Sequence, residues 1–382
     1  MHRPSSSTSS SRIRRLRLSA IASTCIWTLL FLILLDVGVQ CAFPMPIDPR
    51  TEPTTLARYF DYGRSIEGKL TKMIGSTDAK SNRVVLAGWI ENDCAPIVPP
   101  PPSGKVGVSI YGMSFSKHIA SELNAIDPNL PITSYGGPAA GFNHSYACYK
   151  AANSNEQNPN KIQIIGILAS SVNRMLTLGG LTTSFEAPQP FSYPRYLLAH
   201  DELHELKPVV QRPDDLRDAA KMHAYLDQLA QEDAYYDPAL FYGGLLDRSV
   251  IFRFLRRAYA HARTREIDMR LINNGVDFRP NPEVGPVMKA MLRDFAKSAR
   301  NRDQIPMVIL FQDQGTGSDS LYRLLGHDLE QYGLAFVRSD QIASAADPRN
   351  FITDGHFTPA VDHKIAEAVY DKIKYLASGI PR

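Results

Sequence analysis

The sequence has little of what several large classes of protein depend on. Its 382 residues include only four cysteines, no His-Glu-x-x-His zinc helix, and no glycine-rich phosphate loop with its lysine. The turn Gly315-Thr316-Gly317 has Ser320 where a dinucleotide fingerprint has its third glycine. The net charge is only +3, and part of it comes from arginines near the amino terminus, so no concentrated basic face predicts a nucleic-acid partner. We therefore expect no metal, no organic cofactor and no nucleic acid.

The amino terminus does contain a long apolar run. Residues 1–17 form a serine-rich basic head, and residues 18–35 are uncharged and mostly apolar. About 18 such residues are just enough for a helix to cross a bilayer, and a long signal peptide has the same pattern. Four arginines before the run favour a cytoplasmic head and export of the chain beyond the run: Arg12, Arg14, Arg15 and Arg17. We predict a signal peptide or membrane anchor over residues 18–38, with the uncleaved anchor favoured, and an extracytoplasmic location for the rest.

The cysteines fit an exported protein. Cys25 lies in the apolar run and Cys41 at its end, which leaves Cys94 and Cys148 in the exported part. Two thiols in an oxidising compartment can form a disulfide, although two unrelated thiols fit the sequence equally well. Their spacing matches no zinc motif.

The composition divides the chain into four parts. After the head and the apolar segment, residues 39–103 are rich in proline and end in a four-proline run, which predicts a stalk or linker with a short helix at 55–74. Within it, residues 83–90 fit either a strand or an apolar plug. Residues 104–378 form the expected catalytic domain. Its middle, about 181–302, breaks the pattern and predicts a mostly helical insertion, with the clearest helices at 216–229 and 245–258.

The remaining pattern alternates strands with helices. Apolar runs predict strands at 105–111, 130–135, 162–168, 306–311 and 334–338. Helical spacing follows the first strand and returns at 318–332 and 360–376, where the last helix has an i, i+4 apolar stripe. Such alternation predicts an α/β fold with a parallel sheet covered by helices on both faces.

Polar residues follow the ends of these strands. Ser114 comes just after the first strand, a glycine-rich loop at 136–141 follows the second, and Asn173 follows the third. Asp354 and His356 stand just before the last helix. Ligands of open α/β sheets bind beyond the carboxyl ends of the strands, so we expect these groups on one edge. A serine hydroxyl becomes a nucleophile when an imidazole takes its proton and a carboxylate orients that imidazole.

This order of residues resembles the SGNH hydrolases, the GDSL-type esterases, over residues 105–376 apart from the insertion. The resemblance implies a flavodoxin-like three-layer α/β/α sandwich. It also implies Ser114 as nucleophile, His356 as general base and Asp354 as the orienting carboxylate. Asn173 and a backbone N–H of Gly137, Ala139 or Gly141 would form the oxyanion hole, which stabilises the tetrahedral intermediate.

The expected function is that of a secreted or membrane-anchored serine esterase acting on a small-molecule, glycan or lipid ester. Two alternatives stay open: acyl transfer to a polysaccharide hydroxyl through the same residues, and a catalytically inactive binding protein on the same fold. Met113 replaces the aspartate of the family motif, and one residue rather than two separates Asp354 from His356. Ser116 is a competing nucleophile. His118, His144 and His363 are expected to be structural or solvent-facing, and Asp313 follows a strand near the same edge.

Overall fold

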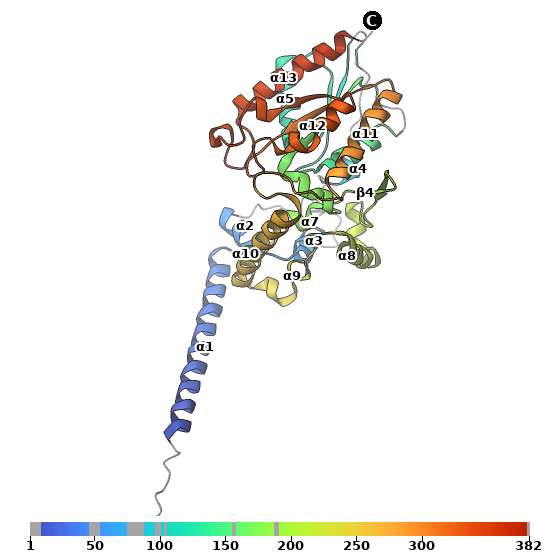
Figure 1. Cartoon of the computed structure of the whole chain (residues 1–382). Helices are drawn as coiled ribbons and strands as arrows, with labels where there is room; N and C mark the ends of the chain where they lie inside the picture. The colour runs from blue at the N-terminus through green and yellow to red at the C-terminus, as the bar shows by residue number, and fades with distance from the viewer. Residues whose placement is uncertain are drawn as a thin grey trace, which may run out of the picture.

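The computed structural model describes residues 9–45, 54–74, 88–95, 101–102, 105–154, 158–186 and 191–379. Residues 1–8 of the expected cytoplasmic head, and residues 46–53, 75–87, 96–100 and 103 of the expected linker, lie outside the described residues. Figure 1 shows a long helix, α1 (Ser9–Ala42), that projects from the folded body beside α2 and α10. The body holds a parallel sheet with helices around it.

The sheet has five parallel strands in the order β2-β1-β3-β6-β7. These are β1 (Val108–Tyr111), β2 (Ile132–Tyr135), β3 (Ile162–Leu168), β6 (Ile305–Phe311) and β7 (Ala335–Arg338). Every residue of β3 is buried, which explains why this central strand is a continuous apolar run. The prediction of an α/β fold with a parallel sheet is confirmed. The chain moves outward in opposite directions from β1 and β3, and the crevice between their carboxyl ends is where such sheets bind ligands.

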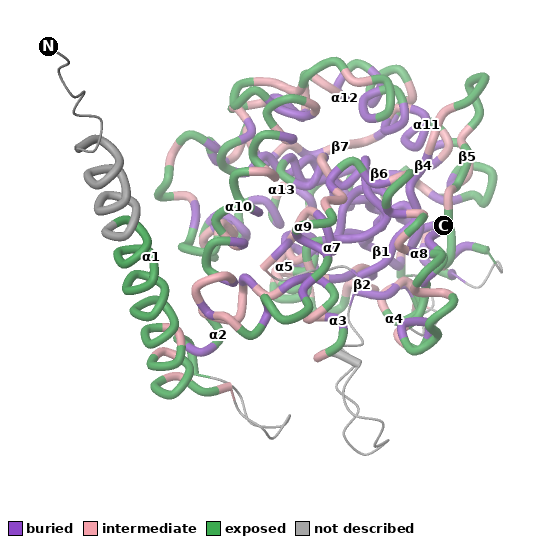
Figure 2. The backbone as a smooth tube through the Cα atoms, turned by 90° about the horizontal axis from the view of Figure 1, so that it is seen from below, coloured by how far each residue is buried: buried purple, intermediate pink, exposed green. Residues whose placement is uncertain are grey.

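Helices cover both faces of the sheet. One core cluster joins the strands to α5 (Ser114–Ile126) and α13 (Pro359–Ser378), through residues such as Ile119, Leu123 and Ile365. The other joins them to α6 (Phe142–Ala152), α11 (Gly285–Asn301) and α12 (Ser320–Gln331), through Tyr149, Phe295 and Leu325. This arrangement is consistent with a three-layer α/β/α fold. In Figure 2 the strands form the buried centre of the body.

The expected insertion differs from its prediction in two places. It contains a two-stranded antiparallel hairpin, β4 (Arg195–Ala199) and β5 (Glu202–Leu206), besides helices. Its last helix, α11, packs on the sheet as the crossover into β6, so the residues that lie away from the sheet end before Gly285. The helical part comprises α7 (Gly180–Thr183), α8 (Ala219–Glu232), α9 (Pro238–Phe241) and α10 (Val250–Ile267), with short turns η3 (Pro213–Arg217), η4 (Gly244–Arg248) and η5 (Asp268–Ile272).

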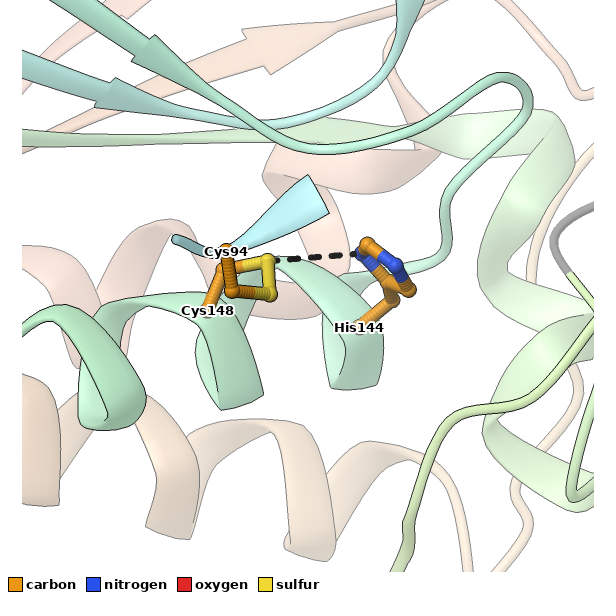
Figure 3. Close-up of side chains that lie close together, drawn as sticks. All are labelled: Cys94, His144 and Cys148. Carbon is orange, nitrogen blue, oxygen red and sulfur yellow. Dashed lines mark hydrogen bonds between the residues drawn. A yellow bond between two sulfur atoms is a disulfide. The ribbon is translucent and has the colours of Figure 1, made fainter. Parts of the chain in front are cut away.

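Parts of the expected stalk pack against this insertion. The segment contains α2 (Thr55–Asp61), α3 (Ile66–Ile74) and α4 (Ile90–Asp93). Ile66, Leu70 and Trp89 are buried in a third core cluster with residues of the insertion. A disulfide joins Cys94, just after α4, to Cys148 on α6, so the pairing that the sequence left open is present (Figure 3). These parts of the segment therefore belong to the folded body.

The apolar amino-terminal segment is helical throughout its described length. Within α1, Ile21–Ala42 is long and apolar enough to cross a membrane, and none of it is buried inside the protein. Figure 2 shows most of Ile21–Ala42 exposed, with a few half-buried residues near its carboxyl end. A signal sequence and a membrane anchor both have these properties.

Candidate active site

Ser114 and His356 meet at the carboxyl edge of the sheet. Ser114 is the first residue of α5, directly after β1 and the turn Gly112-Met113. His356 lies in the loop before α13, and its Nε2 is 2.6 Å from Ser114 Oγ. When the serine hydroxyl donates to Nε2, the imidazole proton is on Nδ1, and Nε2 can take the hydroxyl proton. The two residues are 242 positions apart, so only the fold brings them together.

Two rings hold the imidazole in place. Phe115 stacks on His356 with ring centroids 4.8 Å apart and an interplanar angle of 26°. The ring of His118 lies 5.1 Å away. The backbone carbonyl of His356 also accepts from the N–H of Ile352, which closes the loop that carries the histidine. Because Phe115 and His118 both come from the first turns of α5, the helix that begins with the serine also positions its base.

Asp354 is close to His356 but poorly placed to orient its ring. Its Oδ1 lies 3.0 Å from Nδ1, yet Nδ1 has no well-aligned hydrogen-bond acceptor among the described residues. The same oxygen accepts the backbone N–H of His356 at 3.1 Å. This backbone bond, followed by the contact with the imidazole, lowers the pKa of Asp354. We give more weight to the backbone bond, because its geometry is satisfied and the Asp354 side chain is 62% exposed.

A second carboxylate, Asp362, contacts His118, whose ring is 5.1 Å from that of His356. It is buried in the first turn of α13, and its Oδ2 is 3.2 Å from Nδ1 of His118. Burial raises its pKa to about 6, against the opposing effect of His118 and, to a lesser degree, of His356. This pair was not predicted from the sequence. The spacing of Ser114 and His118, four residues apart on one helix face, was the available signal, but no pattern links α5 to α13.

The glycine-rich loop lies between the serine turn and η2 (Ala169–Leu176). A side chain at Gly136, where φ is 125°, would collide with the carbonyl oxygen of Gly112. At the other end, Gly141 precedes α6, and a side chain there would meet Asn143 and Arg174. Ala139 has a left-handed conformation with φ of 53°. Gly137 packs against Asp93. The loop that was expected to supply a backbone donor for the oxyanion thus runs from the serine turn to η2, where Asn173, the other expected donor, is located.

Asn173 is on η2, next to this loop, but it points to another partner. Its Nδ2 donates to Asp268 Oδ1 at 3.2 Å. Burial raises the pKa of Asp268, although the hydrogen bonds from Tyr235 and Asn173 oppose the shift. Among the described residues no hydrogen bond joins Asn173 to Ser114. The structure therefore brings Ser114, His356 and Asp354 together, and places Asn173 with Asp268.

The start of α5 offers donors that were not predicted from the sequence. The first backbone N–H groups of a helix have no partner within the helix. In α5 the first backbone hydrogen bond of the helical type runs from Lys117 N–H to the carbonyl of Met113. The N–H groups of Ser114 and Phe115 precede it at the positive end of the helix dipole, where negative charge is stabilised.

Ser116, the competing nucleophile, lies in the interior. Only 1% of it is exposed, and its hydroxyl contacts the sulfur of Met113. A side chain at Gly112 or at Gly166 of β3 would come within 1.9 or 2.1 Å of Ser116 Oγ, so both glycines leave room for it. Ser116 is thus a core residue, and Ser114 is the serine that faces the histidine.

A cavity with a mixed polar and apolar border lies on the same edge of the sheet, at the carboxyl ends of β3 and β6. It has a volume of about 400 Å³. Its border includes polar side chains, among them Ser170, Asn173, Arg265, Asp268, Asn273, Gln314 and Thr316, and apolar ones, among them Met269, Ile272 and Phe278. Nδ2 of Asn273 is buried and has no hydrogen-bond partner within the described part of the chain. Next to the cavity, Asp313 accepts the backbone N–H of Ser170 at 2.9 Å. Burial raises the pKa of Asp313 to about 6.

One group of side chains has the composition of a metal site. The ligand atoms of Cys94, His144 and Cys148 lie within 4.8 Å of one another (Figure 3). The two sulfurs are bonded to each other, however, so neither is a thiolate that could bind zinc. Nδ1 of His144 lies 3.8 Å from the sulfur of Cys148, and its Nε2 lies 3.3 Å from Asp93. We interpret His144 as a structural residue, as expected from the sequence.

Comparisons with known proteins give no family for this chain. No protein-family model, curated protein or solved structure matches it. We therefore infer function from the geometry of the site.

Proposed function

We propose that the chain is an extracytoplasmic serine esterase of the SGNH type, with Ser114 as nucleophile and His356 as general base. The observation that carries the proposal is the 2.6 Å contact between Ser114 Oγ and His356 Nε2 at the carboxyl edge of a parallel sheet. The strand order and the order of site residues along the chain support the SGNH type by resemblance. Localisation outside the cytoplasm is supported by the apolar helix and by the disulfide.

The reaction is derived from the positions of the two residues. Ser114 Oγ attacks the ester carbonyl carbon while its proton passes to His356 Nε2. The oxyanion of the tetrahedral intermediate is stabilised by backbone N–H groups at the start of α5 and in the 136–141 loop. The carbon–oxygen bond to the alcohol breaks, and His356 returns the proton to that alcohol. Water then attacks the acyl carbon and gives a proton to His356. The bond between the acyl carbon and Ser114 Oγ breaks, His356 returns the proton to Oγ, and the carboxylic acid is released.

The neighbouring cavity favours a polar substrate. Its border combines apolar side chains with amide, hydroxyl, carboxylate and guanidinium groups, and these polar groups can bind a hydroxyl-rich molecule through paired donors and acceptors. The unpartnered Nδ2 of Asn273 is a donor that a ligand oxygen would satisfy. A volume of about 400 Å³ fits a small ligand of sugar size. We therefore propose an acylated glycan as the substrate class.

Labelling with a fluorophosphonate probe tests the proposal. The full chain in detergent is expected to react, and the reaction is expected to disappear in Ser114→Ala. His356→Ala is expected to slow it by about a hundred- to ten-thousand-fold, the usual range for general-base catalysis. Ser116→Ala is the matched control on the same helix and is expected to label normally. A well-folded wild-type chain that does not label would refute the esterase and favour a binding protein on this fold.

Acyl transfer is the second candidate, because the same acyl-serine can react with an alcohol in place of water. The cavity at the sheet edge would then hold the acceptor sugar. Incubation with an activated acetyl ester, with and without oligosaccharides, separates the two. Acetate release that is unchanged by sugars supports hydrolysis, and acetylated sugar formed at the expense of acetate supports transfer.

A further inference from the structure

The end of α1 is attached to the first turn of α10 by a small hydrogen-bond network on an otherwise apolar helix. Asp36 Oδ1 accepts from the hydroxyl of Ser249 at 3.0 Å and from the backbone N–H of Ile251 at 2.9 Å. Gln40 donates to the other oxygen of Asp36 and to the carbonyl of Arg248. Asp36 therefore places a negative charge at the amino end of α10, where the helix dipole favours it.

These bonds fix the level of α10 along the apolar helix. Asp36 directly follows the apolar run of residues 18–35. With a rise of about 1.5 Å per residue, that run is about 27 Å long, close to the thickness of the hydrocarbon layer. A carboxylate is costly inside that layer, so Asp36 marks its outer boundary. Because Ser249 and Ile251 bind Asp36, the amino end of α10 lies at the same level.

The chain around this level exposes large apolar side chains. We call the following five residues the apolar rim: Tyr242, Leu245, Leu246, Phe254 and Leu255. Leu245 and Leu246 are on η4, directly before α10, and are 77% and 51% exposed. Arg248, at the end of η4, is exposed among them. Figure 1 shows α9 and α10 at the end of the body beside α1, with α13 at the opposite end.

We propose that the apolar rim lies in the outer leaflet of the membrane that α1 crosses, so that the enzyme body rests on the bilayer surface. Apolar side chains at this depth enter the boundary between headgroups and acyl chains, and an arginine beside them binds lipid phosphate. The rim continues the membrane-embedded surface of α1, to which its neighbours Ser249 and Ile251 are hydrogen-bonded. The proposal also requires that α1 stays attached as an anchor, because cleavage after it would remove Asp36 from α10. It does not rest on the esterase activity.

The test measures the depth of the rim with a spin label. The full chain carries Cys25→Ser and Cys41→Ser, which removes the two free cysteines and keeps the disulfide. A label is attached at Leu245→Cys in one protein and at Tyr375→Cys in the other, and both are placed in lipid nanodiscs. Tyr375 is the matched control, because it is 73% exposed and belongs to α13 at the far end of the body. Collisions of the label with oxygen, which concentrates in lipid, are compared with collisions with a water-soluble nickel chelate.

We expect the oxygen-to-nickel ratio to be several-fold higher at Leu245 than at Tyr375. Equal, water-like ratios at the two positions would overturn the proposal. So would a Leu245 label protected from both reagents, which would indicate that a second copy or another protein covers the rim. The mass of the purified chain provides an independent check: a chain that begins beyond Ala42 would lack the anchor, and the proposal would be wrong.

Discussion

Replacing Asp354 with asparagine is expected to lower the rate at which Ser114 is acylated by only about fivefold. The contact from Asp354 Oδ1 to His356 Nδ1 is 3.0 Å, but the carboxylate is 62% exposed and its oxygen is already bonded to a backbone N–H. Exposed pairs of this kind are worth about 1 kcal/mol or less. A loss of about 1 kcal/mol from the transition state corresponds to about a fivefold change in rate.

The assay is the second-order rate constant for fluorophosphonate labelling, measured well above the ordinary titration range of histidine. His356→Ala serves as the reference for a large effect, since loss of the general base is expected to lower this rate constant by about a hundredfold or more. Asp371→Asn is the matched control: this carboxylate is 73% exposed, lies 2.9 Å from Lys374, and belongs to the exposed surface of α13. It is expected to leave the rate unchanged. If Asp354→Asn lowered the rate as far as His356→Ala does, the conclusion that Asp354 is a weak orienting group would be wrong.

Three further predictions concern stability. Burial raises the pKa of Asp313 from 3.8 to about 6. The folded protein therefore holds the carboxyl proton of Asp313 more tightly than the unfolded chain does. The stabilisation that this protonated carboxyl contributes to the free energy of unfolding is lost as pH rises from about 4 to about 6. Asp313→Asn should remove that pH dependence, and above pH ~7 the variant should have a free energy of unfolding up to about 3 kcal/mol higher than wild type. Urea unfolding of both proteins at about pH 4 and at about pH 7 measures the difference. A difference between variant and wild type that does not change with pH would refute the raised pKa of Asp313. Cys94→Ser should lower the free energy of unfolding by about 2–4 kcal/mol, because the disulfide joins residues 54 positions apart. Reduction of the disulfide in the wild-type protein should cause the same loss. Equal stability of the oxidised and the reduced wild-type protein would contradict this prediction. Gly166→Ala should cost about 1–3 kcal/mol by overpacking and should be partly rescued by Ser116→Ala, since the added carbon would lie 2.1 Å from Ser116 Oγ but 3.4 Å from its Cβ. Gly112→Ala should not be rescued, because its added carbon also lies 2.5 Å from that Cβ, which Ser116→Ala keeps. Equal rescue of both in thermal unfolding would show that the Cβ of Ser116 is no obstacle at Gly112, and failure to rescue Gly166→Ala would show that the hydroxyl is not the obstacle there.

Much of the sheet could be predicted because buried parallel strands are continuous apolar runs. The run at residues 162–168 coincides with β3, and the apolar stripe of the last helix became the face of α13 that packs on α5. The hairpin β4–β5 was missed for a physical reason. His200 and Asp201 take the left-handed conformations of its two-residue turn, with φ of 51° and 63°, although sequences usually mark such a turn with Asn-Gly.

The site was predictable in outline but not in detail. The order of residues along the chain placed Ser114 and His356 on the same edge, because parallel strands share that edge. The direction in which a side chain points depends on local packing, which cannot be predicted from the order of residues along the chain. Asn173 therefore turned out to be bonded to Asp268. The spacing along α5 placed His118 on the same helix face as Ser114, but nothing in the sequence indicated its partner Asp362, since the pair forms only when α5 and α13 pack together.

The separation of Ser114 from His356 also sets when the proposed enzyme becomes reactive. The serine belongs to the first strand–helix unit of the sheet, and the histidine is held by the loop before the last helix. At about 5–20 residues per second, the 242 positions between them take roughly ten to fifty seconds to synthesise. Until α13 has emerged and packed on α5, the hydroxyl has no base. A chain that has not yet been made as far as α13 would therefore carry an unreactive serine, and reactivity would appear only once α13 has packed on α5.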